Sequence, residues 1–171
     1  MATPTTDIIP PAIGSEELER RQSELASRTA PTIFRVAGQL LARGRTDTPL
    51  AATEDLSIRL KIYAEGGENE LHAHPSEDHT FIVLQGRARF FDPDEKETVI
   101  GPNQGILLPR GCVYKFFAVE GEPLVMLRIG TPNFQKQPKP NRTDAEGKPM
   151  RGDSKENKSV PVEFLEGRYF G

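Results

Sequence analysis

The three histidines of this chain lie in one short stretch, residues 66–86, which limits the possible folds more than any other part of the sequence. His72 and His74 are two residues apart, so on an extended strand their side chains point to the same face. His79 opens an apolar run at 80–84 that is typical of a second strand, and a turn with a proline joins the two runs. The pattern therefore favours two strands that carry three imidazoles on one side.

Such a cluster predicts a metal site, because imidazole is a good ligand for zinc, copper, iron and nickel. From the spacing alone a second interpretation stays open. Histidines of this kind also serve as ordinary core or surface residues, and short motifs produce false positives.

The same stretch resembles the first motif of the cupin family, which runs glycine, five residues, His-x-His, three or four residues, glutamate, six residues, glycine. Both glycines and the His-x-His pair stand at the corresponding positions of this chain. His79 stands where the family usually has glutamate. Glu77 and Asp78 lie nearby, but neither fits the four-residue spacing.

A second resemblance lies further along the chain. The segment from Pro109 to Gly111 matches the centre of the second cupin motif. Tyr114 stands where that motif has its histidine, Ala118 replaces its asparagine, and Asn103 replaces its leading glycine. The resemblance covers residues 56–130, and it implies a fold more specifically than a reaction.

The implied fold is all-β: a double-stranded β-helix, or jelly-roll barrel, with an N-terminal helix and extended terminal arms. The hydrophobic pattern supports this fold class, since residues 56–63 alternate apolar and polar side chains without a break. Several further short apolar runs, separated by turn residues, are typical of a sandwich or barrel. We expect three regions: an N-terminal arm with a short helix and accessory strands at 1–50, the cupin barrel at 51–131, and an extended C-terminal tail at 132–171.

The two arms carry expectations of their own. Ser15 can cap a helix that runs to about Ser27, as a surface helix or a lid. Residues 32–41 are apolar and β-prone. Because cupins often pack N-terminal strands on a neighbouring subunit, the resemblance implies a homodimer with this segment in the contact. The tail is polar until Val160, and its apolar end is expected to dock on its own barrel or on a partner.

Composition limits the possible binding partners and the cellular compartment. The net charge of −3 and the lack of a basic block argue against nucleic acid. A single cysteine, Cys112, excludes an intramolecular disulfide and fits a reducing cytoplasm. The N-terminus does not read as a secretory signal, and no apolar stretch is long enough to span a membrane. We therefore expect a cytoplasmic protein that binds a small molecule.

The alternation of strand side chains predicts the walls of a pocket around the histidines. If His79 points inward, Phe81 and Val83 do so too, and if Tyr114 points inward, so do its neighbours two positions away on either side, Cys112 and Phe116. Tyr114 is the candidate catalytic residue, because it occupies a ligand position of the family and can contact substrate, hold a water or move a proton. The expected apolar pocket is lined by Phe81, Val83, Cys112 and Phe116.

Three neutral histidines would leave the charge of a divalent ion uncompensated, which favours an anionic, bidentate substrate such as an enolate or catecholate. The resemblance implies a mononuclear cupin enzyme, an oxygenase with iron, zinc or nickel held by His72, His74 and His79. Its substrate would be small and enolisable, diketone-like or aromatic. Two alternatives stay open: a non-catalytic cupin that binds or senses a small molecule, and a metal-assisted isomerase or cyclase.

Overall fold

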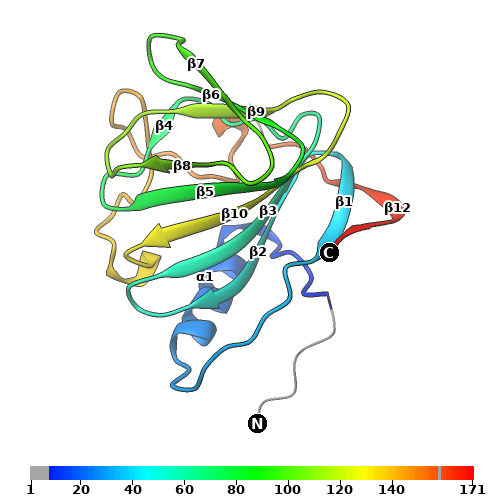
Figure 1. Cartoon of the computed structure of the whole chain (residues 1–171). Helices are drawn as coiled ribbons and strands as arrows, with labels where there is room; N and C mark the ends of the chain where they lie inside the picture. The colour runs from blue at the N-terminus through cyan, green and yellow to red at the C-terminus, as the bar shows by residue number, and fades with distance from the viewer. Residues whose placement is uncertain (1–7, 158) are drawn as a thin grey trace.

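A computed structural model describes residues 8–157 and 159–171 of the chain. Two antiparallel sheets form the body of the fold (Figure 1). The larger sheet has the strand order β2-β3-β10-β5-β8, and the smaller has the order β7-β6-β9. The strands of the larger sheet are β2 (Arg45–Ala52), β3 (Ser57–Tyr63), β10 (Leu124–Thr131), β5 (Asp78–Gln85) and β8 (Gly105–Leu108). Those of the smaller are β7 (Glu97–Ile100), β6 (Ala88–Phe91) and β9 (Lys115–Ala118).

Alternating side chains give the larger sheet two buried faces. On β5 the buried positions are His79, Phe81 and Val83, and these face the smaller sheet. The aromatic rings of Phe81, Phe90 and Phe116 meet there, with centroids 5.1 to 5.8 Å apart. The expected double-stranded β-helix is confirmed, since this packing closes an all-β body around one aromatic core.

The opposite face of the larger sheet is covered by the arms. Leu60 and Ile62 of β3 pack there against Leu40 and Leu41 of β1 (Gly38–Arg43). β1 pairs with the C-terminal strand β12 (Glu163–Phe170), so the first and last strands of the chain lie side by side (Figure 1). The apolar end of the chain therefore docks on its own barrel. The expected strand at residues 32–36 is not formed, and the homodimer stays a prediction.

The N-terminal helix α1 (Gly14–Ala26) packs on β2. Its expected cap is wrong: the N-cap is Ile13, and Ser15 lies inside the helix. The side chain of Glu17 accepts a hydrogen bond from the Ile13 N–H over 2.7 Å, which satisfies one of the free donors at the helix start. No helix in the described part of the chain has the length and apolar character needed to cross a bilayer.

Between β10 and β12 the chain folds back over the open end of the barrel. This segment contains two short 3-10 helices, η1 (Phe134–Lys136) and η2 (Lys155–Asn157), and the strand β11 (Thr143–Asp144). β11 pairs with β4 (His72–Ala73), which carries the first histidine. The region expected to be an extended tail thus forms a wall beside the histidines.

Candidate metal centre

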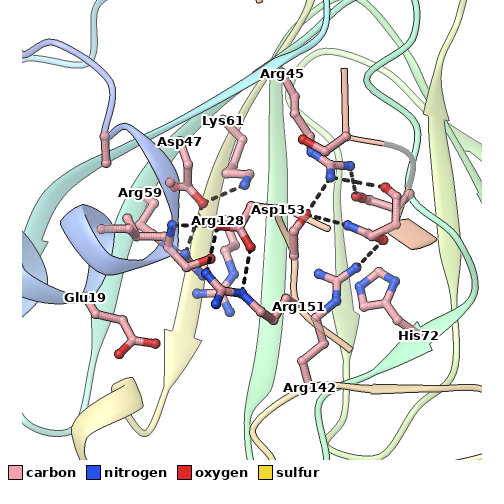
Figure 2. A pocket seen from close by; sticks show the side chains of 18 of the residues that line it. Glu19, Arg45, Asp47, Arg59, Lys61, His72, Arg128, Arg142, Arg151 and Asp153 are labelled. Carbon is pink, nitrogen blue, oxygen red and sulfur yellow. Dashed lines mark hydrogen bonds and ion pairs between the residues drawn. The ribbon is translucent and has the colours of Figure 1, made fainter. Parts of the chain in front are cut away.

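A cavity of about 1100 Å³ opens above the aromatic core. Its walls come from α1, from strands β2, β3 and β10, and from the segment that folds back after β10. Figure 2 shows a polar interior, with charged side chains reaching in from several walls. The lining at its base includes His72, His74, Glu77, Tyr114 and Arg128.

His72 lies on β4, a strand of only two residues, and His74 follows that strand directly. The backbone of His72 exchanges two hydrogen bonds with Tyr114, each 3.0 Å long, and these tie β4 to the start of the β9 segment. His79 comes from the well-ordered centre of the fold, where β5 is paired on both sides, with β10 and with β8. The rings of the three histidines lie close together, with centroids 5.3 Å apart for His72 and His74 and 4.0 Å apart for His74 and His79.

The tightest group of ligand atoms in the described residues contains His74, Glu77 and His79, all within 4.8 Å of one another. Glu77 Oε2 lies 2.9 Å from His79 Nε2 and 3.9 Å from His74 Nδ1. His72 is not a member of this group, but its ring centroid is 5.3 Å from that of His74. Two imidazoles and one carboxylate fit a divalent metal by the chemistry of the donor set.

Each imidazole has an oxygen partner at Nδ1. For His72 this is the carbonyl oxygen of Glu70, at 2.7 Å. For His74 it is the carbonyl oxygen of Asn141, at 3.1 Å. Because a carbonyl only accepts, both Nδ1 atoms carry the proton and both Nε2 atoms keep a lone pair. Metal-binding histidines are commonly oriented in this way.

The histidines are also held neutral. Burial lowers the pKa of all three well below its usual value. Nearby positive charge adds to the effect, from Arg142 at His72 and from Arg128 at His79. A neutral imidazole is the form that binds a metal, because a protonated ring has no free lone pair.

Arg128 is the main charge at the base of the cavity. It is 3% exposed, and it donates to Glu77 Oε1 over 2.7 Å. The same nitrogen also contacts His79 Nε2. Burial opposes the charged form of Glu77, but Arg128 and Arg59 outweigh this and hold the Glu77 pKa below its usual range.

Tyr114 is buried, and its hydroxyl lies 3.2 Å from His79 Nδ1. Burial raises the pKa of the phenol above its usual value, so Tyr114 stays protonated at neutral pH. Nε2 of His79 lies against both the Arg128 guanidinium and Glu77 Oε2, and the direction of the hydrogen bond between Nδ1 and the Tyr114 hydroxyl depends on the tautomer of the ring. In this arrangement Tyr114 fixes the orientation of His79.

The four expected pocket residues divide into two pairs. Phe81 and Phe116 line the cavity. Val83 is buried in the core, and Cys112 packs half-buried against that core; neither is among the residues that line the cavity. Burial raises the pKa of the Cys112 thiol, which makes it a poor nucleophile.

Sequence reasoning missed Glu77 and Arg128. Glu77 was set aside because it does not fit the spacing of the cupin motif, although it lies only three residues beyond His74. Arg128 could have been found by period two on β10, since Leu124 and Met126 on that strand are core residues and Arg128 continues their face.

Comparison with known proteins agrees with this architecture. The Cupin domain family model matches residues 59–130. The uncharacterized protein YdbB of Bacillus subtilis (strain 168) is 32% identical over 66 residues, which are 39% of this chain. These residues span 57% of the length of that curated relative.

Solved structures show the same fold. An uncharacterized conserved protein with a double-stranded β-helix domain from Klebsiella pneumoniae subsp. pneumoniae superposes with a TM-score of 0.52 at 18% identity, covering 60% of this chain and 80% of the other. The polyketide cyclase RemF from Streptomyces resistomycificus gives 0.51 at 18% identity, covering 70% and 84%. Residues 59–130 thus match the Cupin domain model, and the chain shares the double-stranded β-helix fold of these solved structures.

Proposed function

We propose that this protein is a mononuclear metal-dependent cupin enzyme, and that it acts as an oxygenase on a small enolisable, diketone-like or aromatic substrate. The observation that carries the proposal is the group of His74, Glu77 and His79, with their ligand atoms within 4.8 Å of one another. Two histidines and one carboxylate with open positions are typical of non-haem iron oxygenases. His72 stands beside this group as a further ligand.

Metal binding at this group is the first requirement of the proposed function. Arg128 contacts Nε2 of His79, the same lone pair that a metal would take. A metal held by this group would take this lone pair, and Arg128 would keep its hydrogen bonds to Glu77 and Ser57. When bound, the metal supplies a Lewis-acidic centre for an anionic substrate. Through its hydroxyl at Nδ1, Tyr114 holds the ring of His79 in a fixed orientation.

The other walls orient the substrate and exclude water. Phe81 and Phe116 form an apolar base beside the histidines, which suits a planar diketone or aromatic ring. Arg128 holds positive charge next to the carboxylate, so the charge of Glu77 does not repel an anionic substrate. The whole arrangement is preorganised, because the histidines and Arg128 are already fixed by hydrogen bonds.

The same donor set favours a second candidate, a metal-assisted isomerase or cyclase, because two histidines and a glutamate also hold catalytic zinc. The identity of the metal separates the two. We propose elemental analysis of protein purified without added metal, followed by oxygen uptake with a panel of β-diketones and catechols. About one iron per chain together with oxygen uptake is the expected result.

Other outcomes are equally informative. One zinc per chain without oxygen uptake would favour the isomerase or cyclase. Protein that binds no divalent metal when iron, zinc and nickel are offered would overturn the metal centre and leave a non-catalytic binding protein. Among variants, His74→Ala and Glu77→Gln should lose the metal, whereas the exposed Glu97→Gln should keep it.

A further inference from the structure

Two cationic side chains that line the cavity, Arg45 and Arg142, have no carboxylate partner within the described residues, and of these Arg142 has the fewer hydrogen-bond acceptors. Arg142 lines the cavity, and within the described residues its side chain donates one hydrogen bond, from Nη2 to the amide oxygen of Asn157 over 2.7 Å. Its Nε is buried and donates to nothing in the described structure. The guanidinium thus keeps at least one free donor.

Arg59 also has a buried Nε without a partner in the described structure, but its charge is paired with Asp47. Arg45 is enclosed by oxygen acceptors, four of them backbone carbonyls and one an amide oxygen. The rest have a carboxylate within 4 Å: Arg59 and Lys61 with Asp47, Arg128 with Glu77, Lys139 with Glu19, and Arg151 with Asp153.

Arg142 is held rigidly in this position. The amide nitrogen of Asn157 donates to the Gly152 carbonyl over 2.7 Å, which fixes the oxygen end of that amide toward Arg142. Asn157 itself is fully buried. A guanidinium fixed from one side offers its remaining donors in a constant direction, and this lowers the entropy lost when a ligand binds.

Arg142 lies close to the histidines. Figure 2 shows Arg142 beside His72, and after burial Arg142 makes the largest contribution to the lowered pKa of His72. Burial lowers the pKa of Arg142 to about 10, and Arg45 and Arg128 act in the same direction. The group is still charged at neutral pH, so the cavity holds a buried positive charge that no carboxylate of the described residues pairs with. A buried charge without a partner is costly, and an anion would remove that cost.

We propose that Arg142 binds a carboxylate of the substrate, so that the substrate is anchored at this guanidinium while its reacting part lies over His72, His74 and His79. This inference rests on the proposed function for the reacting part only. The fork of a guanidinium matches a carboxylate through parallel N–H donors, which gives both affinity and orientation. The substrate class is then an enolisable or aromatic carboxylic acid.

The test uses malonate, with the neutral malonamide as its matched analogue. Binding to the full chain is measured by calorimetry at constant ionic strength. Wild-type protein should bind malonate and not malonamide. Arg142→Gln should weaken malonate binding by about tenfold or more, because a charge-assisted pair is lost. Arg151→Gln, a second lining cation that is already paired with Asp153, is the control and should leave binding unchanged.

Three results would overturn the inference: no malonate binding by wild type, unchanged binding by Arg142→Gln, or equal losses in both variants, which would indicate only a general charge effect. If Arg142→Gln does not fold, phenylglyoxal labelling of wild type replaces it. Malonate should then slow the labelling of Arg142 and not that of Arg151, and equal rates with and without malonate would contradict the assignment.

Repeating the titration on metal-stripped protein separates this inference from the metal centre. If the protein binds no metal but still binds malonate in a way that depends on Arg142, the role of Arg142 is supported and the metal proposal fails. If the protein binds metal but Arg142→Gln binds malonate as tightly as wild type, the metal proposal stands and the role of Arg142 is refuted.

Discussion

Arg128 and Glu77 form a buried ion pair, 2.7 Å between Nη2 and Oε1, at a position where the chain also places two histidines. Both side chains are 5% exposed or less. The pair crosses from the turn before β5 to the end of β10, so it ties the two central strands together next to the candidate metal. This relationship makes the base of the cavity sensitive to any change of charge.

Glu77→Gln should therefore destabilise the metal-free protein strongly. The change leaves Arg128 buried without its counter-ion, and breaking one side of a buried pair costs about 3 kcal/mol. Urea unfolding of metal-stripped protein measures the loss. The double variant Glu77→Gln with Arg128→Met should lose less than the sum of the two single changes. Additive losses would show that the two side chains do not stabilise each other.

The stability of metal-stripped protein should fall as the pH drops below about 6.5. Burial lowers the pKa of His72, His74 and His79 in the folded state, so between the folded and unfolded pKa values the unfolded chain binds protons that the folded chain does not. The stabilising effect is complete above about 6.5 and is lost below it. Three such groups give a slope of up to about 4 kcal/mol per pH unit.

Urea unfolding at pH 7.5, 6.5 and 5.5 tests this slope. The acidic groups with a lowered pKa, such as Glu77, titrate below about 4.5 and do not contribute in this window. His72→Gln should reduce the slope by roughly a third, since one of the three titrating groups is removed. A flat profile between pH 7 and 5.5 would contradict the neutral, buried state of the histidines.

Tyr114→Phe should weaken metal binding without abolishing it. The change removes the hydroxyl that hydrogen-bonds with Nδ1 of His79, and loss of such an orienting partner typically costs 10–100-fold in metal affinity or activity. Titration with a competing chelator measures the affinity. Tyr63→Phe is the control, because Tyr63 is equally buried in the same core and contacts Phe116 instead.

Turnover of the same Tyr114→Phe protein at saturating metal separates orientation from chemistry. If Tyr114 is also a general acid or base, turnover should fall by a further factor on the order of 10². If both metal affinity and turnover are unchanged, Tyr114 only lines the cavity and has neither role.

The sequence predicted the parts of the fold that depend on local alternation. Period two on β5 correctly placed His79, Phe81 and Val83 inward. It was less useful for β2, which carries polar residues and Pro49 and has no clean alternation. β2 is an edge strand of its sheet, and an edge tolerates proline because one side needs no backbone partner. β2 is a strand because it pairs with β3, and its own sequence does not predict it.

The charged part of the site depends on contacts between distant segments. Glu77 and Arg128 are 51 positions apart, and Arg45 contacts Asn157 across 112 positions. No local pattern predicts such pairs, because the partner is set by the way the segment after β10 returns over the barrel. The polar composition of that segment suggested an extended tail, whereas its polar side chains are used to line the cavity.

Gly130→Ala should disturb the ion pair without changing any charge. Gly130 stands opposite His79 in the β10–β5 pairing, and a Cβ at this position would overlap Glu77 Oε1 and approach Arg128 Nη1 to 2.7 Å. Both contacted groups are buried and have little room to move, so the pair must shift. We expect a loss of stability of roughly 1–3 kcal/mol, as for other overpacked cores. Metal affinity should fall as well, because Glu77 is displaced.

Gly101→Ala is the matched control, since a Cβ there meets no atom closer than 3.6 Å. Thermal unfolding and chelator titration of the two variants side by side measure both effects. A Gly130→Ala protein that behaves like Gly101→Ala would show that Glu77 and Arg128 adapt freely, and that the site does not depend on their present geometry.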